Sequence, residues 1–255
     1  MRRAVLRFAY HWVAQFVDPF RFARAIRNSP AFVSDYLAYR RMPGSERIGL
    51  RDLQPSLHER SGSHEFDPHY FYLNAWAMRR VCATRPVMHF DVASQIPFGT
   101  ALSAVLPVYY IDFRPLSVHL SGLHSIAANA VQLPLRDGSA PSLSCLHVAE
   151  HIGLGRYGDP LDPRGTIRAA AELTRVIAPG AELLFALPIG RPRVCFNAHR
   201  IHSAVAIREL FAVLELLEYS GVGDDAVFAE SVPLHRFDHH EYACGMFRFR
   251  KRAAR

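Results

Sequence analysis

The chain has 255 residues, of which 50% are hydrophobic and 21% are charged. This composition excludes a disordered or collagen-like protein, and the length allows a core that needs no disulfides. The four cysteines lie far apart without a CxxC pair, so we expect free thiols in a reducing compartment and no cysteine-based zinc site. No apolar run in the sequence reaches the ~18–20 residues of a membrane-spanning helix, which predicts a cytoplasmic protein.

The net charge of +7 would suit an anionic partner. The basic residues are nearly all arginines spread along the chain, without a nucleic-acid-binding motif, so we expect no nucleic-acid partner. Residues 1–17 combine apolar side chains with arginines at helical spacing. Two interpretations stay open for this segment: a helix that packs on the main domain, which we favour, or a helix on the inner face of an anionic membrane.

Two regions of the sequence differ in pattern. Residues 1–65 form a predicted N-terminal helical extension, with helical spacing through residues 20–39 and a polar, turn-rich linker at residues 60–64. Residues 66–255 alternate short apolar runs with helical patterns, which predicts an α/β domain with a parallel sheet. In this domain we predict helices over residues 71–84, 99–106, 165–178 and 203–217, a helix or loop over 117–125, and strands over 87–92, 108–112, 130–132, 142–147, 182–187, 226–232 and 242–250.

Polar residues follow several of the predicted strands. Ligands of an open parallel sheet bind beyond the carboxyl ends of its strands, so these residues are candidates for a site. Asp91 ends the first strand and Asp112 the second, where a carboxylate can accept hydrogen bonds from both hydroxyls of a ribose. Asn129 lies beside the third, short strand. The fourth strand leads into His147-Val148-Ala149-Glu150-His151.

This order of residues resembles that of class I S-adenosylmethionine-dependent methyltransferases, and ELTRVIAPG at residues 172–180 resembles the segment that leads into their fifth strand. Four further segments resemble a methyltransferase-like family called domain of unknown function 268. They are GLGRYGDPLDP at 153–163, FNAHR at 196–200, FDPHYFY at 66–72 and WA at 76–77. The resemblance implies a Rossmann-like class I methyltransferase sheet, mostly parallel with a final antiparallel strand. It also implies S-adenosylmethionine as cofactor and a polar small-molecule acceptor, such as a sugar or surface-polysaccharide precursor.

The resemblance also assigns roles to residues by position. The first loop departs from the superfamily's glycine-rich DxGxG, because Ala93 and Gln95 replace glycines that let a backbone approach a ligand. The implied cofactor-binding residues are Asp91, Ala93, Ser94, Asp112, Asn129 and His147. Three residues near the methyl donor are candidates for the chemical step, namely His151, His199 and Glu150. Each could take a proton from a hydroxyl acceptor or orient the group that takes it. The acceptor is assigned to Arg156, Tyr157, Asp159, Asp162, Phe196, Asn197 and Arg200.

Other interpretations of the same residues stay open. The sequence from His147 to His151 also spells the HxxEH of inverted zinc peptidases, but it breaks at Ile152 too soon for a helix, so we expect no metal site. Asp91 could serve only to bind neighbouring backbone, and the aspartates at 159 and 162 could cap turns of a rigid lid. The aromatic cluster at 70–76 is favoured as core over a substrate platform. The alternative function is a degenerate methyltransferase fold that acts as a binding or scaffold module in glycan assembly. The sequence does not predict the oligomeric state.

Overall fold

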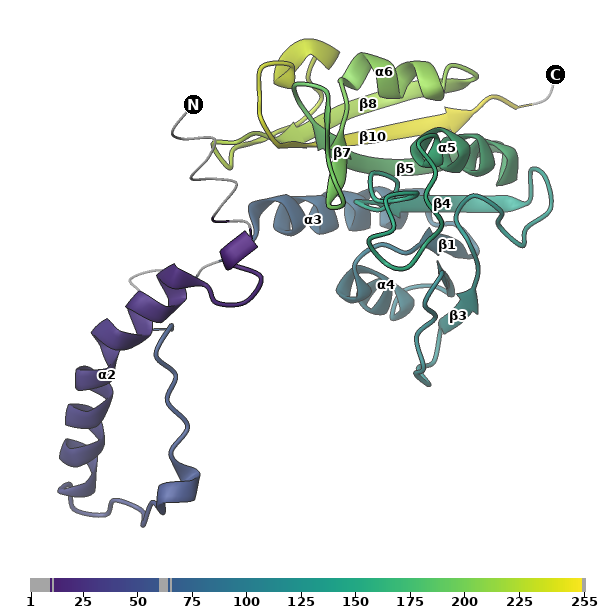
Figure 1. Cartoon of the computed structure of the whole chain (residues 1–255). Coiled ribbons are helices and arrows are strands. Elements are labelled where there is room, and N and C mark those ends of the chain that lie inside the picture. Colours follow the sequence, from purple (N-terminus) through teal and green to yellow (C-terminus); the bar gives the residue numbers. More distant parts are fainter. Residues whose placement is uncertain (1–9, 11, 60–63, 65, 254–255) are drawn as a thin grey trace. The chain divides into compact units, whose positions relative to one another are not determined.

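The computed structural model describes residues 10, 12–59, 64 and 66–253, and the chain divides into two compact units, Met1–Glu65 and Phe66–Arg255 (Figure 1). No helix in these described ranges is long and apolar enough to cross a membrane. The predicted helix over residues 1–17 and the predicted linker at 60–64 fall mainly on residues outside the described part.

The first unit is built on helix α2 (Pro19–Arg40), which confirms the helix predicted over residues 20–39. The carboxylate of Asp18 caps its start by accepting hydrogen bonds from two backbone amides of the first turn. The segment that follows α2 contains the 3₁₀ turn η1 (Leu50–Asp52). It returns along the helix and is held there by the Asn28 side chain, which donates to Leu57 O at 2.6 Å.

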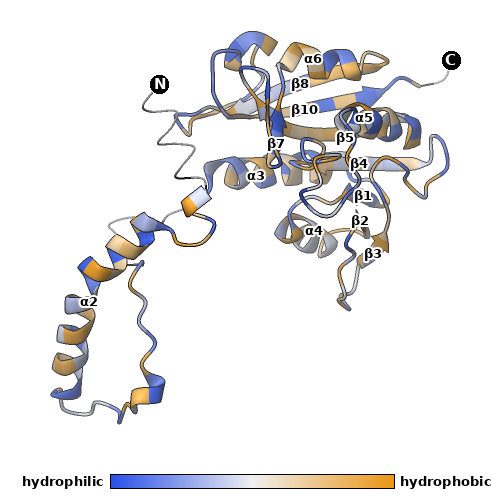
Figure 2. Cartoon of the chain, viewed as in Figure 1, coloured by the Kyte–Doolittle hydropathy of each residue, from blue (hydrophilic) through white to orange (hydrophobic). Residues whose placement is uncertain are grey.

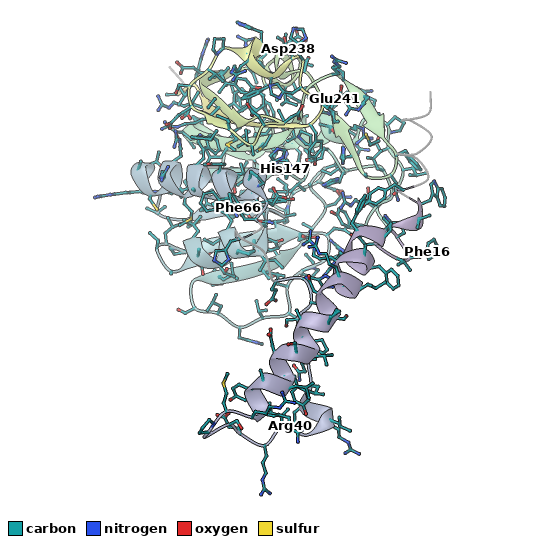
Figure 3. All side chains as sticks on the ribbon, turned by 90° about the vertical axis from the view of Figure 1, so that its left-hand side faces the viewer. Phe16, Arg40, Phe66, His147, Asp238 and Glu241 are labelled. Atoms are coloured by element: carbon teal, nitrogen blue, oxygen red, sulfur yellow. The ribbon has the colours of Figure 1, made fainter. Side chains whose placement is uncertain are left out.

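Helix α2 has no buried residue. Hydrophobic and hydrophilic residues alternate around it, as Figure 2 shows, and Phe16 and Arg40 lie near the two ends of this helical segment (Figure 3). One side of the helix exposes large apolar side chains, namely those of Phe22, Ile26, Val33 and Leu37.

The second unit is a sheet of eight strands with helices on both faces. The order across the sheet is β3 (Leu123–Ala127), β2 (Val108–Asp112), β1 (His89–Val92), β4 (Ala140–Leu146), β5 (Ile177–Ile189), β10 (Ala243–Lys251), β8 (Leu214–Val222) and β9 (Phe228–Ala229). The strands from β3 to β5 pair in parallel, whereas β10 is antiparallel to both of its neighbours. This arrangement confirms the predicted fold class.

Two hydrophobic cores lie on opposite faces of this sheet. On one face, α3 (Pro68–Thr84) and α4 (Ile96–Ser103) bury Trp76 and Phe98 against β2 and β10. On the other face, α5 (Gly165–Val176) and α6 (Ala204–Leu210) pack on the central strands around Phe185 and Phe211. A hairpin of β6 (Arg193–Cys195) and β7 (His199–Ile201) follows β5, and the 3₁₀ turn η2 (Leu234–Phe237) precedes β10.

Two predicted elements are wrong. The third strand lies at residues 123–127, where it pairs with β2, and not at 130–132. The helix predicted over residues 203–217 ends at residue 210, and residues 214–222 form β8 instead. Strand β8 occupies the free edge of β10, whose backbone groups would otherwise be left without a partner. Backbone pairing therefore outweighs the helical spacing of the apolar residues in this stretch.

Candidate functional site

A cavity lies where the carboxyl ends of β1, β2 and β4 meet. Because β2 and β4 flank β1 on opposite sides, the chain reverses its direction of winding here, which is where ligands of such sheets bind. The cavity has two adjoining lobes. The first lies around Ile111, Phe113 and Asn129, and the second around Tyr70, Leu116 and Tyr242. Residues that line both lobes are Ala93, Asp112, Arg114, His147, His151 and Tyr157.

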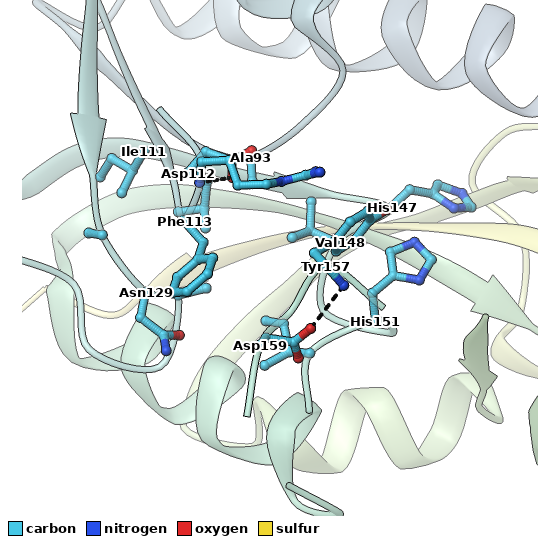
Figure 4. Close-up of a pocket in the computed structure, with 15 residues that line it drawn as sticks. Ala93, Ile111, Asp112, Phe113, Asn129, His147, Val148, His151, Tyr157 and Asp159 are labelled. Atoms are coloured by element: carbon cyan, nitrogen blue, oxygen red, sulfur yellow. Dashed lines mark hydrogen bonds between the residues drawn. The ribbon is translucent and has the colours of Figure 1, made fainter. Parts of the chain in front are cut away.

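The first lobe is a largely apolar slot whose lining also includes polar residues (Figure 4), namely Asp112, Arg114, Asn129, His147, His151, Tyr157 and Asp159. Asp112 ends β2, where its Oδ1 accepts a hydrogen bond from Arg114 N at 2.8 Å and its Oδ2 accepts one from the Tyr110 hydroxyl at 3.2 Å. Each oxygen has a further lone pair, so the carboxylate can accept two more hydrogen bonds. Asn129 Oδ1 accepts from Val131 N at 3.1 Å, which leaves its amide hydrogens as donors.

The loop after β1 keeps a glycine-like path although it lacks glycine. Ala93 has a φ of 53°, in the left-handed region that favours glycine, and its small side chain lines both lobes. The Ser94 hydroxyl donates to Asp91 Oδ1 at 2.5 Å and accepts from Leu146 N at 3.1 Å, which ties this loop to the end of β4. Ala93 therefore adopts a backbone conformation that glycine favours, at a position where DxGxG has a glycine.

Asp91 is fully buried and lines neither lobe. Its Oδ1 accepts hydrogen bonds from the hydroxyls of Ser94 and Ser144, and Ser144 is in turn bonded to the buried ring of His89. Burial raises the pKa of Asp91 to about 6, although both serine hydroxyls oppose this shift. The structure thus places Asp91 behind the loop, where it holds the backbone in position.

A buried carboxylate lies behind two imidazoles in the turn after β4. Glu150 is fully buried, and its Oε1 lies 3.1 Å from His147 Nδ1 and 3.6 Å from His151 Nε2. On its other side, His147 Nε2 lies 3.1 Å from Cys244 Sγ on β10. Both imidazoles line the cavity, whereas Glu150 does not. Figure 4 shows the two rings on the side of the cavity opposite Ile111 and Asn129.

The two histidines differ in charge. Burial lowers the pKa of His147, but Cys244 and Glu150 outweigh burial and raise the pKa well above its ordinary value. Burial would raise the pKa of Glu150, but the hydrogen bond and charge of His147 lower it. For His151, burial dominates and lowers the pKa. These directions favour an imidazolium at His147, a carboxylate at Glu150 and a neutral imidazole at His151 near pH 7.

The loop between Gly153 and Gly165 crosses itself at its base. A Cβ at Gly153 would lie 2.1 Å from Asp162 O, and one at Gly165 would lie 2.1 Å from Ile152 O. Asp162 N also donates to Gly153 O at 3.0 Å. Only glycine allows the two backbone segments to approach this closely, so the glycines of the motif fix the shape of the loop.

Three further polar residues of the predicted site hold this loop. The buried Arg200 donates to Ile152 O at 2.6 Å and to Asp162 O at 3.0 Å. The carboxylate of Asp162 accepts from Arg164 N and pairs with Arg168. Asp159 accepts from two backbone amides of the loop, and it also lines the first lobe. The loop is therefore a closed unit that presents its tip to the cavity.

The cavity brings together part of the predicted site. Its lining includes Ala93, Ser94, Asp112, Asn129, His147, His151, Arg156, Tyr157 and Asp159. Outside the lining lie Asp91, Glu150, Asp162, Phe196, Asn197, His199 and Arg200. Phe196 and Asn197 are exposed at the β6–β7 turn, and the His199 ring packs against Tyr242 with the centroids 4.8 Å apart.

Among the lining residues that the sequence analysis misses are Arg114, Tyr70 and Tyr242. Arg114 follows Asp112 by two positions, so its place just after the strand is a signal that could have marked it as a candidate site residue. Tyr70 belongs to the aromatic cluster favoured as core. In that cluster Trp76 is indeed buried, but Tyr70 lines the second lobe. Tyr242 stands directly before β10, and no pattern in the sequence around it predicts that it lines the site.

The HxxEH sequence forms turns, not a helix. Its two imidazoles flank the Glu150 carboxylate, and the described ranges contain no group of three or more His, Cys, Asp or Glu residues arranged to hold a metal ion. This arrangement differs from the helix-borne ligands of zinc peptidases.

Solved structures with the same architecture are found at low sequence identity. The YcgJ protein from Bacillus subtilis superposes with a TM-score of 0.53 at 10% identity, over 72% of this chain and all of that one. The N-methyltransferase NodS from Bradyrhizobium japonicum WM9 gives 0.50 at 14% identity, over 72% and 97%. The cyclase SpnF gives 0.52 at 13% identity, over 77% and 86%. These similarities show the fold alone, and the fold carries more than one reaction.

A family model described as Caenorhabditis protein of unknown function, DUF268, matches residues 140–251. The chain has the fold of these methyltransferase structures, and its residues 140–251 are similar to DUF268. The matched region includes the predicted family strings at 153–163 and 196–200, whereas those at 66–77 lie before it. No curated protein matches the sequence.

Proposed function

We propose that this DUF268-related protein transfers the methyl group of S-adenosylmethionine to a polar small molecule. The observation that carries this proposal is the pair of adjoining lobes at the switch point of the sheet. An apolar slot with Asp112 and Asn129 suits an adenosine, and the lobe beside it, lined by hydroxyls and imidazoles, suits an acceptor. Ala93 and His147 border both lobes, so they lie where donor and acceptor would meet.

The residues of the first lobe fit the cofactor. Asp112 has two unused acceptor positions for the ribose hydroxyls, and the Asn129 amide can donate to an adenine edge. The glycine-like backbone at Ala93 leaves room for the methionine portion. When bound, S-adenosylmethionine supplies a methyl group already activated by its sulfonium. The protein then contributes mainly by holding the two reactants in contact, which can supply ~7–11 kcal/mol of the barrier.

His151 is the residue we assign to take the proton of a hydroxyl acceptor. Its Nδ1 lies 2.6 Å from Ala198 O and 3.2 Å from Arg156 Nη1. Because the shorter contact is to an atom that can only accept, we assign the hydrogen to Nδ1 and the lone pair to Nε2. Nε2 is 3.6 Å from Glu150 Oε1, beyond a hydrogen bond, and we assign its lone pair to the acceptor. Glu150 would stabilise the imidazolium that forms. We propose a sugar or polysaccharide-precursor hydroxyl as the acceptor, supported by the hydroxyl-rich lining of the second lobe.

Calorimetric titration with S-adenosylmethionine and S-adenosylhomocysteine tests the cofactor assignment. We expect micromolar binding that Asp112→Ala weakens at least tenfold, about 1.4 kcal/mol. The matched control is Asp137→Ala, because the Asp137 side chain is 82% exposed and lies outside the cavity lining. Absence of binding at millimolar cofactor by a folded wild type would overturn the proposal and leave the scaffold function.

The role of His151 has its own test once release of S-adenosylhomocysteine has identified an acceptor. We expect His151→Ala to lower kcat by about 10²–10⁴-fold, the usual contribution of a general base, with little change in cofactor affinity. His199→Ala is the control because His199 does not line the cavity. Unchanged turnover in His151→Ala would remove this residue from the mechanism.

A further inference from the structure

Two arginines flank one tyrosine ring at the second lobe. The Arg114 Cζ lies 4.3 Å from the centroid of the Tyr157 ring, and the Arg156 Cζ lies 5.2 Å from it. Arg114 comes from the segment after β2, and Arg156 from the closed loop after β4. All three side chains line the second lobe. The cation–π contacts hold both guanidinium planes against the ring without consuming their hydrogen-bond donors.

The positive charge of this pair is not neutralised within the cavity. In the part of the chain that the structure describes, neither Arg114 nor Arg156 forms an ion pair. Asp112 and Asp159 are the carboxylates of the lining, and neither forms an ion pair with Arg114 or Arg156; both accept hydrogen bonds from backbone amides of their own loops. Arg156 Nη1 donates to Ala198 O at 3.0 Å and lies 3.2 Å from His151 Nδ1, whereas Nε and Nη2 of Arg156 have no hydrogen-bond partner among the described residues.

We propose that the acceptor carries an oxyanion, a carboxylate or a phosphate, which binds to Arg114 and Arg156. This inference rests on the proposed function, because it names the substrate class of the same site. A guanidinium presents paired donors that match the oxygens of either group. Tyr70 and Tyr242 line the same lobe and can bind the rest of the molecule through ring faces and hydroxyls. Burial raises the pKa of Tyr70 to about 12, so its hydroxyl remains a donor at neutral pH.

Three hexoses that differ only at the sixth carbon test this inference: glucose, glucuronate and glucose 6-phosphate. Each is titrated into ¹⁵N-labelled full-length protein while the arginine Nε–Hε signals are followed by NMR. We expect saturable shifts of the Arg114 and Arg156 signals with at least one anionic sugar, at an affinity at least tenfold above that of glucose. Shifts with glucuronate alone identify a carboxylate, and shifts with glucose 6-phosphate alone identify a phosphate.

Variants of the two arginines assign the signals and provide the control. Arg114→Gln and Arg156→Gln should each remove one signal and abolish the preference for the anionic sugars. Arg208→Gln, on the exposed side of α6, should leave that preference unchanged. Equal affinity for all three hexoses, or no shift at tens of millimolar of either anion, would overturn the inference.

The cofactor carries a carboxylate of its own, so the titrations are repeated with the protein saturated in S-adenosylhomocysteine. Persistence of the anion-dependent shifts shows a second oxyanion site, whereas their loss shows that the arginines hold the cofactor and overturns the inference. Failure of the proposed function is a separate result. It is seen as absence of S-adenosylhomocysteine binding by calorimetry, whether or not the anionic sugars bind.

Discussion

Replacing Glu150 by alanine tests the charge assignment at the centre of the site. The variant leaves the buried His147 imidazolium without its carboxylate, which lies 3.1 Å away in the wild type. At an effective dielectric constant of ~20, two unit charges at that distance attract by about 5 kcal/mol. Part of this attraction offsets the desolvation of the two ions. Removal of one partner of a buried pair costs about 3–5 kcal/mol, so we expect Glu150→Ala to lower the free energy of unfolding by that amount.

The loss should depend on pH. Because the pKa of His147 is raised in the folded protein, His147 stabilises the fold fully when the pH is below its pKa in the unfolded chain, about 6.5. This stabilisation disappears as the pH rises through the pKa in the folded protein. Because the pKa of Glu150 is lowered in the folded protein, Glu150 stabilises the fold fully when the pH is above its ordinary pKa of 4.5. This stabilisation disappears as the pH falls through the lowered pKa. The difference between wild type and variant should therefore be largest between about pH 4.5 and 6.5.

Urea unfolding, followed by circular dichroism across this range and at alkaline pH, measures the difference. Glu150→Gln separates charge from packing, because the amide keeps the volume and loses the charge. Glu209→Ala, at an exposed position on α6, serves as the surface control. An equal loss at every pH would refute the ion pair and leave packing as the role of Glu150.

Two further predictions concern the loop and the N-terminal unit. Gly165→Ala places a Cβ against Ile152 O and should destabilise the protein by about 3 kcal/mol, whereas Gly99→Ala, where a Cβ has ordinary contacts, should be near neutral in thermal unfolding. Equal melting temperatures for the two variants would contradict the backbone crossing. The exposed apolar side of α2, on a helix rich in arginine, predicts binding to vesicles of anionic lipid. Flotation should recover the wild type but not Ile26→Asp, and equal recovery with neutral lipid would refute electrostatic docking.

The sequence predicted those parts of the fold and site that depend on local pattern. Asp112 is predictable because a buried run that ends in a polar residue marks a strand end, and strand ends of a parallel sheet share one edge. The assignment of Asn129 rests on the family resemblance instead, because the strand predicted beside it at 130–132 is wrong. Strand β8 was missed because its residues continue the apolar spacing of the preceding helix, and only pairing with β10 decides between the two. Propensity gives way to a long-range contact in such cases.

The rest of the site depends on contacts between distant segments. Tyr70 and Tyr242 line one lobe because β10 enters the sheet beside β5, and no spacing in the sequence encodes that approach. Asp162 and Arg200 carry the groups of a typical ligand site, yet both are used to hold backbone carbonyls and amides of a loop. Residue type alone cannot separate these two uses, because a backbone group and a ligand offer the same hydrogen-bonding partners.

The position of β10 has a consequence for how the site comes into being during translation. This strand is the last of the sheet in the sequence, but it is inserted between β5 and β8. It places Tyr242, directly before it, in the lining of the second lobe and Cys244 Sγ 3.1 Å from His147 Nε2. A nascent chain that already contains every strand from β1 to β5 therefore lacks one wall of the second lobe and a neighbour of His147. We therefore expect a ribosome-bound chain stalled before residue 242 to have the lining of the first lobe but an incomplete second lobe.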